Sequence, residues 1–419
     1  MTAESKRPPA VVLGLGHPRQ TAYVKSLAKF GVPVHAMHSE RSIYVASRRL
    51  TRFHLLDRDA QSQLADIESL GKRLGRGFLV PTNDDNVALV SQNLERLSKN
   101  FLIPLPGWEA IGEIFDRAKC YAKASAAGIA VPQYWMPTSD AGMKEAVGAL
   151  EPHKSDYIIK TPSILSAPAN EAAIRLTKAA PKQHRDILAS CEELKRRTGE
   201  YPMIQQVVPG AADSAIGVTM IVSRKGDIVL TYCVRRLRLA SYRIDAGYVH
   251  PYELGSVVWC ETTHDDEAVE AARELVRAFR YYGQITVEFR RDARDGSLHL
   301  MKVEPRPVRA TSLSSAIGMD IPTILYRVFL GESVEVPKEY PDGVGWLWTM
   351  AYGQSLFHNP HHNRRDLLRV LRSSNRIRAF AEDFADPMLL TRWVARSAAR
   401  RMRGLFGRTG PKRSLSEAR

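Results

Sequence analysis

The chain has 419 residues, of which 44% are hydrophobic and 25% charged, so it has a globular composition and is too long for one ordinary hydrophobic core. It has no run of 18 or more apolar residues, which argues against a transmembrane helix, and its polar first residues lack the apolar core of a signal peptide. The four cysteines are scattered without a Cys-x-x-Cys pair, which argues against a zinc site or a disulfide framework. We therefore expect a cytoplasmic protein of two or more domains.

The formal net charge of +15 is unevenly distributed. Residues 388–419 contain nine Arg or Lys and one Glu, a local net charge of +8. The remainder is only modestly basic, so composition does not require nucleic acid, and we expect no nucleic-acid partner.

Strand and helix signals alternate between residues 8 and 130, which predicts a parallel sheet with helices on it. The first strand, residues 11–13, ends in a Gly-Leu-Gly segment that lacks the third glycine of a dinucleotide fingerprint, so a tight turn is the better interpretation. A polar segment at residues 81–85 follows another strand. It could bind a small substrate, because open α/β sheets place ligands there, or it could cap the next helix, which we favour slightly.

The pattern changes after residue 116. A helix over 116–128 is followed by a strand over 157–160 that ends in Lys160. Residues 203–239 and 283–304 are rich in strand signals, and an amphipathic helix over 265–281 lies between them. This order predicts an α+β region with antiparallel sheets.

Two apolar runs, residues 285–292 and 300–306, are joined by a polar turn that contains glycine, which predicts a hairpin. Alternation places Glu288 on one face with Thr286, and Lys302 and Glu304 share a face. Pairing of the two strands can bring these charges to one side, where two carboxylates would suit Mg²⁺ that carries nucleotide phosphates. A surface hairpin with solvated charges is an equally open interpretation.

The order of these segments resembles the ATP-grasp superfamily, and within it the predicted carboxylate–amine ligases. The resemblance covers roughly residues 10–330 and rests on order and spacing rather than on one decisive motif. Its segments are Leu79–Asp84, Leu105-Pro106, Asp116-Arg117, Gly128–Pro132, Ile159-Lys160, Ile204–Gly210, Val287–Phe289 and Glu304–Arg306.

The resemblance implies an N-terminal parallel α/β domain, then a two-lobed ATP-grasp fold with antiparallel sheets, and a C-terminal helical extension. The implied domains are residues 1–115, a small or lid lobe at 116–205, a large lobe with the metal and phosphate site at 206–335, and the extension at 336–419. It also implies an ATP-dependent ligase that joins a small-molecule carboxylate to an amine-type nucleophile through an acylphosphate, with release of ADP. ATP and Mg²⁺ are the implied cofactors.

The family roles fall on residues of this chain. Arg117 and Lys160 are implied to contact nucleotide phosphates, and Arg306 the transferred phosphate. The remaining implied roles are the adenine hinge at Gln206, Val207 and Val208, the ribose contact at Asp213, and the magnesium ligands Glu288 and Glu304. Alternation also predicts Arg236 and Arg238 on one face, where both are candidates to hold an anionic substrate or the acylphosphate; solvated charges at a strand edge are the other interpretation.

The chain departs from the family pattern at three places. Lys302 replaces the carboxylate that normally bridges two magnesium ions, and Glu304 replaces an asparagine. The ammonium of Lys302 could take the place of one cation, which would make Lys302 part of a one-metal catalytic site, or catalysis could have been lost. Residues 161–168 contain two prolines and no glycine, so fewer backbone donors are available to phosphate, and Gln206 replaces a common glutamate. The alternative function is therefore a nucleotide-binding pseudoenzyme that acts as a scaffold or sensor.

Residues 346–419 lie outside the core of the resemblance. His358, His361 and His362 have spacing compatible with a metal site, although a polar loop or helix start is the better interpretation. Apolar residues at helical spacing and intervening arginines predict a basic amphipathic helix at residues 388–410. This helix could contact the inner face of the membrane peripherally, or it could pack on the body of the protein.

Overall fold

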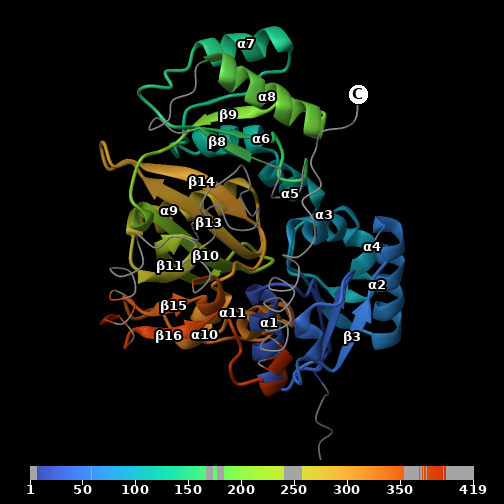
Figure 1. Ribbon diagram of the computed structural model, residues 1–419. Helices are drawn as coiled ribbons and strands as arrows, with labels where there is room; N and C mark the ends of the chain where they lie inside the picture. The colour runs from blue at the N-terminus through green and yellow to red at the C-terminus, as the bar shows by residue number, and fades with distance from the viewer. Residues whose placement is uncertain are drawn as a thin grey trace, which may run out of the picture.

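The computed structural model describes residues 7–57, 59–166, 173–176, 184–239, 257–352 and 375–389, with a few further positions between 368 and 392. Figure 1 shows three regions: an N-terminal α/β domain at the lower right, a large antiparallel sheet at the left, and a small lobe at the top. The expected combination of a parallel sheet with antiparallel sheets is confirmed.

The N-terminal domain contains a five-stranded sheet in the order β3-β2-β1-β4-β5, in which all neighbouring strands are parallel. Its strands are β1 (Ala10–Leu13), β2 (Val34–His38), β3 (Arg52–Leu55), β4 (Gly77–Pro81) and β5 (Phe101–Leu102). Its helices are α1 (Pro18–Lys29), η1 (Ile43–Ala46), α2 (Ala60–Leu74), α3 (Asp84–Gln92) and α4 (Leu94–Ser98). Every side chain of β1 is buried, because α1 packs on one face of the sheet while α2 and α3 pack on the other.

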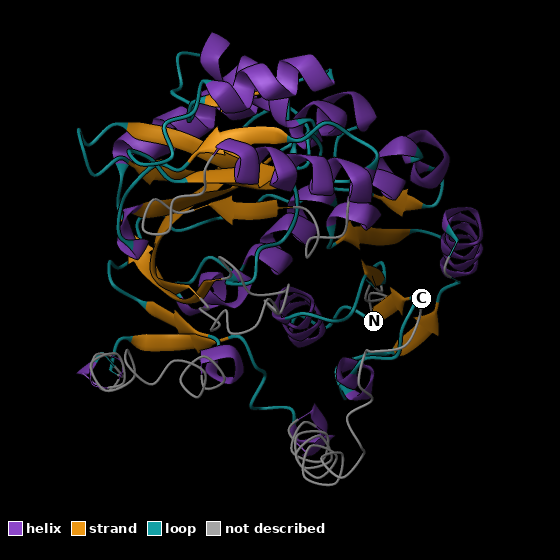
Figure 2. Ribbon diagram, turned by 45° about the horizontal axis from the view of Figure 1, so that its top comes forward, coloured by secondary structure: helices purple, strands orange, loops and turns teal. Residues whose placement is uncertain are grey.

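The small lobe has a four-stranded antiparallel sheet in the order β6-β9-β7-β8. Its strands are β6 (Tyr134–Trp135), β7 (Tyr157–Lys160), β8 (Ala173–Leu176) and β9 (Met203–Gln206). Helices α7 (Asp140–Gly148) and α8 (His184–Thr198) cover one face, where Met143, Ile187 and Leu194 bury against Ile159 and Ile204. Figures 1 and 2 show these helices on the outer side of the lobe, so the sheet lies between them and the rest of the molecule.

The large sheet has seven strands in the order β14-β13-β10-β11-β12-β15-β16. Its central strands are β10 (Ala215–Val222), β11 (Ile228–Leu239), β12 (Val257–Thr263), β13 (Gly283–Arg291) and β14 (Leu298–Glu304), preceded by the short helix η2 (Ala212–Ser214). Helix α9 (Asp266–Ala278) starts where the Asp265 side chain accepts a hydrogen bond from the backbone N–H of Ala268. Its apolar side packs on one face of the sheet, so the other face of β13 is left for polar groups.

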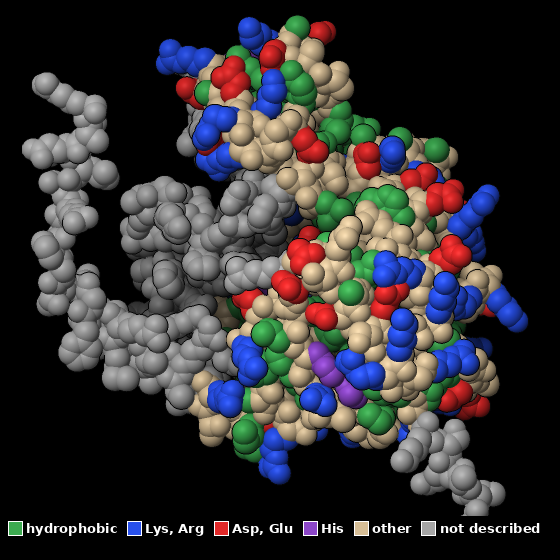
Figure 3. Space-filling view, turned by 90° about the vertical axis from the view of Figure 1, so that its right-hand side faces the viewer, with side chains coloured by type: hydrophobic (Ala, Val, Ile, Leu, Met, Phe, Trp, Pro, Cys, Tyr) green, Lys and Arg blue, Asp and Glu red, His purple; other side chains and the backbone are tan. Residues whose placement is uncertain are grey.

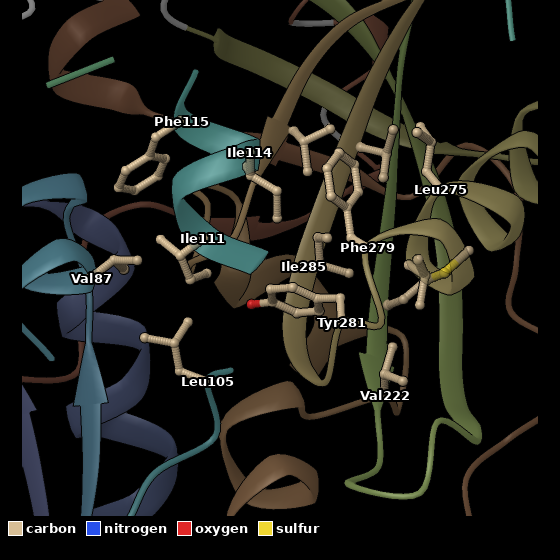
Figure 4. Close-up of a cluster of buried hydrophobic side chains, with 14 of the residues drawn as sticks. Val87, Leu105, Ile111, Ile114, Phe115, Val222, Leu275, Phe279, Tyr281 and Ile285 are labelled. Carbon is tan, nitrogen blue, oxygen red and sulfur yellow. The ribbon is translucent and has the colours of Figure 1, made fainter. Parts of the chain in front are cut away.

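Helices α5 (Trp108–Phe115) and α6 (Arg117–Ala126) connect the N-terminal domain to the small lobe. Figure 4 shows Ile111 and Ile114 of α5 in one cluster with Phe279, Tyr281 and Ile285 of the large lobe. Apolar residues of α2 and α3 belong to the same buried cluster. The N-terminal domain and the large lobe therefore share a hydrophobic core, which fixes their relative position.

The C-terminal region contributes α10 (Thr311–Ala316), α11 (Ile321–Phe329), β15 (Gly345–Leu347) and β16 (Ile377–Phe380). The sequence predicted a helical extension after residue 335, whereas β15 pairs with β12 and β16 pairs with β15, so this part of the chain also extends the large sheet. These strands are only three and four residues long, too short for a periodic signal.

The segment after β16 contacts the N-terminal domain. Asp383 accepts hydrogen bonds from Arg49 at 2.6 Å and forms an ion pair with Lys25 at 3.0 Å, and Asp386 accepts from the Ser47 hydroxyl at 2.6 Å. Nearly all of the predicted basic helix at 388–410, and the three histidines at 358–362, lie outside the described residues. Within the described ranges, no helix is long and apolar enough to cross a membrane.

Candidate active site

The predicted hairpin is present and its register brings its charged side chains together. β13 and β14 are antiparallel, with Glu288 opposite Lys302 and Thr286 opposite Glu304. Because Ile285 and the other alternate apolar residues of β13 face α9, the three charged side chains lie on the opposite face of the sheet. The expectation that pairing gathers these charges on one side is confirmed.

Each hairpin carboxylate is paired with a cation. The Lys302 ammonium lies 2.5 Å from Glu304 Oε1, the Arg306 guanidinium lies 3.3 Å from the same oxygen, and Arg236 forms an ion pair with Glu288. Burial alone would raise the pKa of Glu304, but the charges of Arg306 and Lys302 outweigh it and hold that pKa well below its usual range. Both carboxylates are therefore placed among cations rather than solvated on a surface.

Arg306 connects the hairpin to the N-terminal domain. Its Nε lies 2.6 Å from Asp84 Oδ1 and its Nη2 lies 3.1 Å from Asp84 Oδ2, a bidentate contact across 222 residues of sequence. The side chain of Arg306 is 8% exposed. Burial would lower its pKa, but Asp84 and Glu304 raise it instead, so the guanidinium stays charged.

The polar segment after β4 does more than cap a helix. Asn83 is the N-cap of α3 and accepts a hydrogen bond from the backbone N–H of Asn86, as the favoured interpretation predicted. The next residue, Asp84, supplies the carboxylate for Arg306. Sequence reasoning did not assign Asp84 a role; the available signal was its position at the end of a parallel strand.

Lys160 is the last residue of β7 in the small lobe. Its ammonium donates to Gln205 Oε1 at 2.9 Å, an oxygen that also accepts from the Tyr121 hydroxyl at 3.1 Å. Burial, together with the nearby charges of Arg117 and Lys302, lowers the pKa of Lys160 to about 7. When an anion binds beside such a lysine, the anion favours the charged ammonium and raises the pKa of the lysine again.

Arg117 is the first residue of α6 and binds the segment that follows β7. Its Nε donates to the carbonyl oxygen of Thr161 at 2.9 Å, and its backbone N–H donates to the carbonyl of Pro162 at 3.0 Å. Burial lowers its pKa. Residues 167 and 168 of the glycine-free segment lie outside the described ranges, so only its start at 161–166 is placed.

The predicted hinge follows the end of β9. The backbone N–H groups of Gln206 and Val207 donate to the carbonyls of Gln133 and Asp156, both at 2.9 Å. Among the described residues, no hydrogen bond uses the backbone N–H of Val208, which is therefore the hinge donor available to a ligand. Asp213 lies nearby in the chain, exposed in η2.

The expectation that Arg236 and Arg238 share a face is wrong. A register shift in β11 pairs Arg236 with Cys260 and Arg238 with Trp259, which are consecutive residues of β12 and point to opposite faces. Arg236 reaches Glu288, whereas the Arg238 guanidinium lies 4.9 Å from the ring centroid of Tyr352. Of the two candidates, Arg236 is therefore the one that lies beside the hairpin.

Two further arginines, which sequence reasoning missed, lie near the hairpin. Arg19 is in the first turn of α1, and Arg309 follows β14. Both interact electrostatically with Glu304 and Arg306. The resulting cluster of described side chains has more cations than carboxylates: Arg19, Arg117, Lys160, Arg236, Lys302, Arg306 and Arg309 against Asp84, Glu288 and Glu304. Arg19 and Arg306 are buried and the other five cations are half-buried. Such an excess of cations suits a polyanion such as a nucleoside triphosphate.

The hairpin fits one magnesium ion better than two. No group of three or more His, Cys, Asp or Glu suited to a metal occurs among the residues that the structure describes. Glu288 and Glu304 are diagonal neighbours on adjacent strands, and Lys302 stands opposite Glu288. One or two carboxylates, completed by phosphate oxygens and water, are a usual magnesium donor set, and the Lys302 ammonium already balances the charge of Glu304.

Comparison with solved structures identifies the fold. The structure is similar to N5-carboxyaminoimidazole synthetase from Staphylococcus aureus complexed with ADP, with a TM-score of 0.60, 15% identity and coverage of 80% of each chain. It is also similar to biotin carboxylase from Campylobacter jejuni, with a TM-score of 0.60, 13% identity and coverage of 82% of this chain and 75% of that one. The chain has the ATP-grasp fold.

A third ATP-grasp neighbour is the biotin carboxylase domain of 2-oxoglutarate carboxylase from Hydrogenobacter thermophilus, crystallised with MgADP, ADP and bicarbonate. Its TM-score is 0.60 at 11% identity, with coverage of 80% of this chain and 73% of that chain. No protein-family model matches the sequence, and no curated protein matches it. At these identities the likeness establishes the ATP-grasp fold, while the reaction must be argued from the side chains.

Proposed function

We propose that this protein is an ATP-dependent ligase that joins a small-molecule carboxylate to an amine-type nucleophile through an acylphosphate. The observation that carries the proposal is the Arg306 guanidinium, held by Asp84 of one domain and Glu304 of another, at the centre of a buried excess of cations. Such an arrangement is suited to a phosphoryl group that passes between two substrates.

The nucleotide would lie between the small lobe and the large lobe. Lys160 and Arg117 would bind its phosphates. The backbone N–H of Val208, which has no hydrogen bond among the described residues, would bind the adenine edge. Asp213, which is exposed next to this segment, remains the candidate for the ribose hydroxyls. Neighbouring folds are described with bound ADP, which is consistent with this placement.

Glu288 and Glu304 would hold one magnesium ion, which would neutralise charge on the nucleotide phosphates. The chain's own part is to position the reactants and compensate charge. A carboxylate oxygen attacks the γ-phosphorus and ADP leaves; the amine then attacks the acyl carbon, and phosphate departs with the former carboxylate oxygen. Arg306 would bind the phosphoryl group in both steps, because its planar guanidinium can bind two oxygens at once.

In this scheme Lys302 acts as a fixed cation in place of a second metal. Its ammonium lies against Glu304, so it would reduce the repulsion between that carboxylate and incoming phosphate. Arg236 would do the same for Glu288. Arg238, on the other face of β11, would act on substrate only if its contact with Tyr352 changed.

The test is nucleotide product analysis with purified protein, Mg-ATP and pooled amino acids and carboxylate metabolites. We expect ADP release that depends on the pool, and a loss of about 100-fold or more in the variant Arg306→Lys, which keeps the charge but not the fork. Lys195→Met is the matched control, because Lys195 pairs with Asp140 on the surface of the small lobe. ADP release that is independent of the pool would contradict the ligase.

The second candidate, a nucleotide-binding pseudoenzyme, is favoured by one observation, the ion pair between Lys302 and Glu304 at the metal position. It predicts tight binding of ATP without pool-dependent ADP release, and recovery of turnover in the variant Lys302→Glu.

Peripheral membrane contact through residues 388–410 is a separate prediction. It requires the full chain to co-sediment with anionic but not zwitterionic vesicles.

A further inference from the structure

The N-terminal end of α1 contains a buried arginine without a partner. Arg19 is the second residue of this 12-residue helix and is 8% exposed. Within the described part of the chain it makes no hydrogen bond or ion pair, and its Nε is a buried donor without an acceptor. A buried N–H donor without an acceptor costs free energy, so the unpaired Nε of Arg19 needs an explanation other than folding.

The carboxylates near Arg19 are engaged by other cations. Asp84 receives both arms of Arg306, and Glu304 receives Lys302 and Arg306. Arg19 interacts with them only at longer range, and it is repelled by Arg306 and Arg309. Burial, followed by these two arginines, lowers the pKa of Arg19 to about 9. Among the described residues, no carboxylate therefore lies against Arg19 to balance its positive charge.

The backbone around Arg19 adds to the positive potential. Pro18 starts the helix, and the Gln20 side chain accepts hydrogen bonds from the N–H groups of His17 at 2.6 Å and Gly16 at 3.3 Å, which fixes the preceding turn. The N-terminal end of a helix carries a partial positive charge. Burial and the three arginines lower the pKa of His17 to about 3, so this ring is neutral at physiological pH and can donate or accept one hydrogen bond.

We propose that the N-terminal end of α1 is an oxyanion subsite in which Arg19 and Arg309 bind a phosphate or carboxylate group carried by the acceptor substrate. The inference rests on the proposed ligase function and names a property of its second substrate. Arg306 interacts electrostatically with both arginines and is also the proposed contact of the transferred phosphate. A substrate anchored at Arg19 therefore extends toward the reacting groups.

This subsite is distinct from the nucleotide phosphate contacts. Lys160 is affected by Arg117 and Lys302, whereas Arg19 is affected by Arg306 and Arg309. Lys302 and Arg306 both contact Glu304 Oε1, so this carboxylate lies at the junction of the two groups of cations. In this proposal the anion of the nucleotide binds beside Lys160 and the anion of the acceptor binds beside Arg19.

The test uses the full chain saturated with Mg²⁺ and a non-hydrolysable ATP analogue, titrated by calorimetry with inorganic phosphate and, separately, with malonate. We expect one of the two probes to bind in wild type, which distinguishes a phosphate from a carboxylate substrate group. Arg19→Met should weaken that probe at least tenfold, while Arg96→Met, which removes an exposed partner of Glu68, should leave it unchanged. Equal binding by wild type and Arg19→Met, or no binding of either probe, would overturn the subsite.

A stability measurement excludes a purely structural role. If Arg19 is an uncompensated cation in the free protein, Arg19→Met should have a higher melting temperature than wild type. Phosphate or malonate should raise the melting temperature of wild type but not that of Arg19→Met, so the two values should become closer. A lower melting temperature in Arg19→Met would contradict the inference. If the protein binds nucleotide but the probe binds equally with and without Arg19, the subsite is overturned and the ligase is not. If the probe needs Arg19 but the protein does not bind nucleotide, the ligase is overturned and the subsite is not.

Discussion

Nucleotide binding should be accompanied by proton uptake at Lys160. In the free protein this pKa is about 7 instead of the ordinary lysine value of 10.5, so at pH 8 about a tenth of the Lys160 side chains are protonated. A phosphate group beside the ammonium favours the charged form and raises the pKa back toward its ordinary value. Binding at pH 8 should therefore take up about 0.9 proton per nucleotide, and the dissociation constant should increase by about 50-fold between pH 7 and pH 9.

The assay is calorimetry of Mg-ATP analogue binding at pH 8 in buffers with different ionisation enthalpies. This pH lies above the titration of the phosphate itself, so uptake reports on the protein. Lys160→Met should bind more weakly and show no such uptake, while Lys195→Met should match wild type. Uptake that persists unchanged in Lys160→Met would refute the assignment of Lys160 to the nucleotide phosphates.

The same shift has a consequence for stability in the absence of ligand. The folded-state pKa of Lys160 lies below its unfolded value, so the unfolded chain binds more protons between pH 7 and 10.5. The contribution of this lysine to the free energy of unfolding should therefore rise with pH across that window, by up to about 1.4 kcal/mol per pH unit. Wild type and Lys160→Met should differ in the pH dependence of urea unfolding, and parallel profiles would argue against a buried, partly deprotonated lysine.

Three further substitutions test the geometry. Asp84→Asn should destabilise the fold by about 2–3 kcal/mol in urea unfolding, because Arg306 loses its bidentate partner while the Asp84 side chain is 27% exposed; a change below about 0.5 kcal/mol would show that the contact is not maintained in solution. Lys302→Glu should lower the melting temperature without magnesium, since it gathers three carboxylates, and magnesium should restore it; no response to magnesium would count against a metal site. Gly283→Ala should cost about 3 kcal/mol or more, because its φ is +106° and a Cβ would lie 2.1 Å from the carbonyl oxygen of Pro104; a wild-type urea midpoint would mean that this close approach is relaxed.

Elements with strong local signals were predicted well from the sequence. Strand β4 ends where the predicted polar segment at residues 81–85 begins, and β10 lies within the stretch of strand signals at residues 203–239. The hairpin of β13 and β14 has the predicted facing of Glu288, Lys302 and Glu304. These strands combine apolar character or clear alternation with polar or glycine-containing turns, which fixes both extent and register.

Irregular features were predicted less well because they depend on packing. Helix α1 starts at Pro18, because proline is tolerated in the first turn of a helix. Strand β11 continues to Leu239 and contains a register shift near Leu237, which no period-2 pattern signals. That single irregularity moves Arg238 off the face that it was expected to share with Arg236.

Only part of the candidate site could be predicted from the sequence, because the rest also depends on packing. Its hairpin residues are close in sequence, so alternation places them, whereas Asp84, Arg19 and Arg309 join from segments far apart in the chain. On the outer face drawn in Figure 3, basic and acidic side chains are interspersed, and the concentration of unbalanced arginines lies inside the molecule instead. Composition reports the total charge but not the position of a buried excess.

The most direct test of the central claim is transfer of oxygen-18 from a labelled carboxylate pool to inorganic phosphate during turnover with Mg-ATP. An acylphosphate route transfers one carboxylate oxygen to each phosphate released when the amine attacks. We predict labelled phosphate that appears with ADP in wild type and that falls together with ADP in Arg306→Lys. ADP release with unlabelled phosphate would mean that water, not a carboxylate, receives the phosphoryl group, and would contradict the ligase assignment.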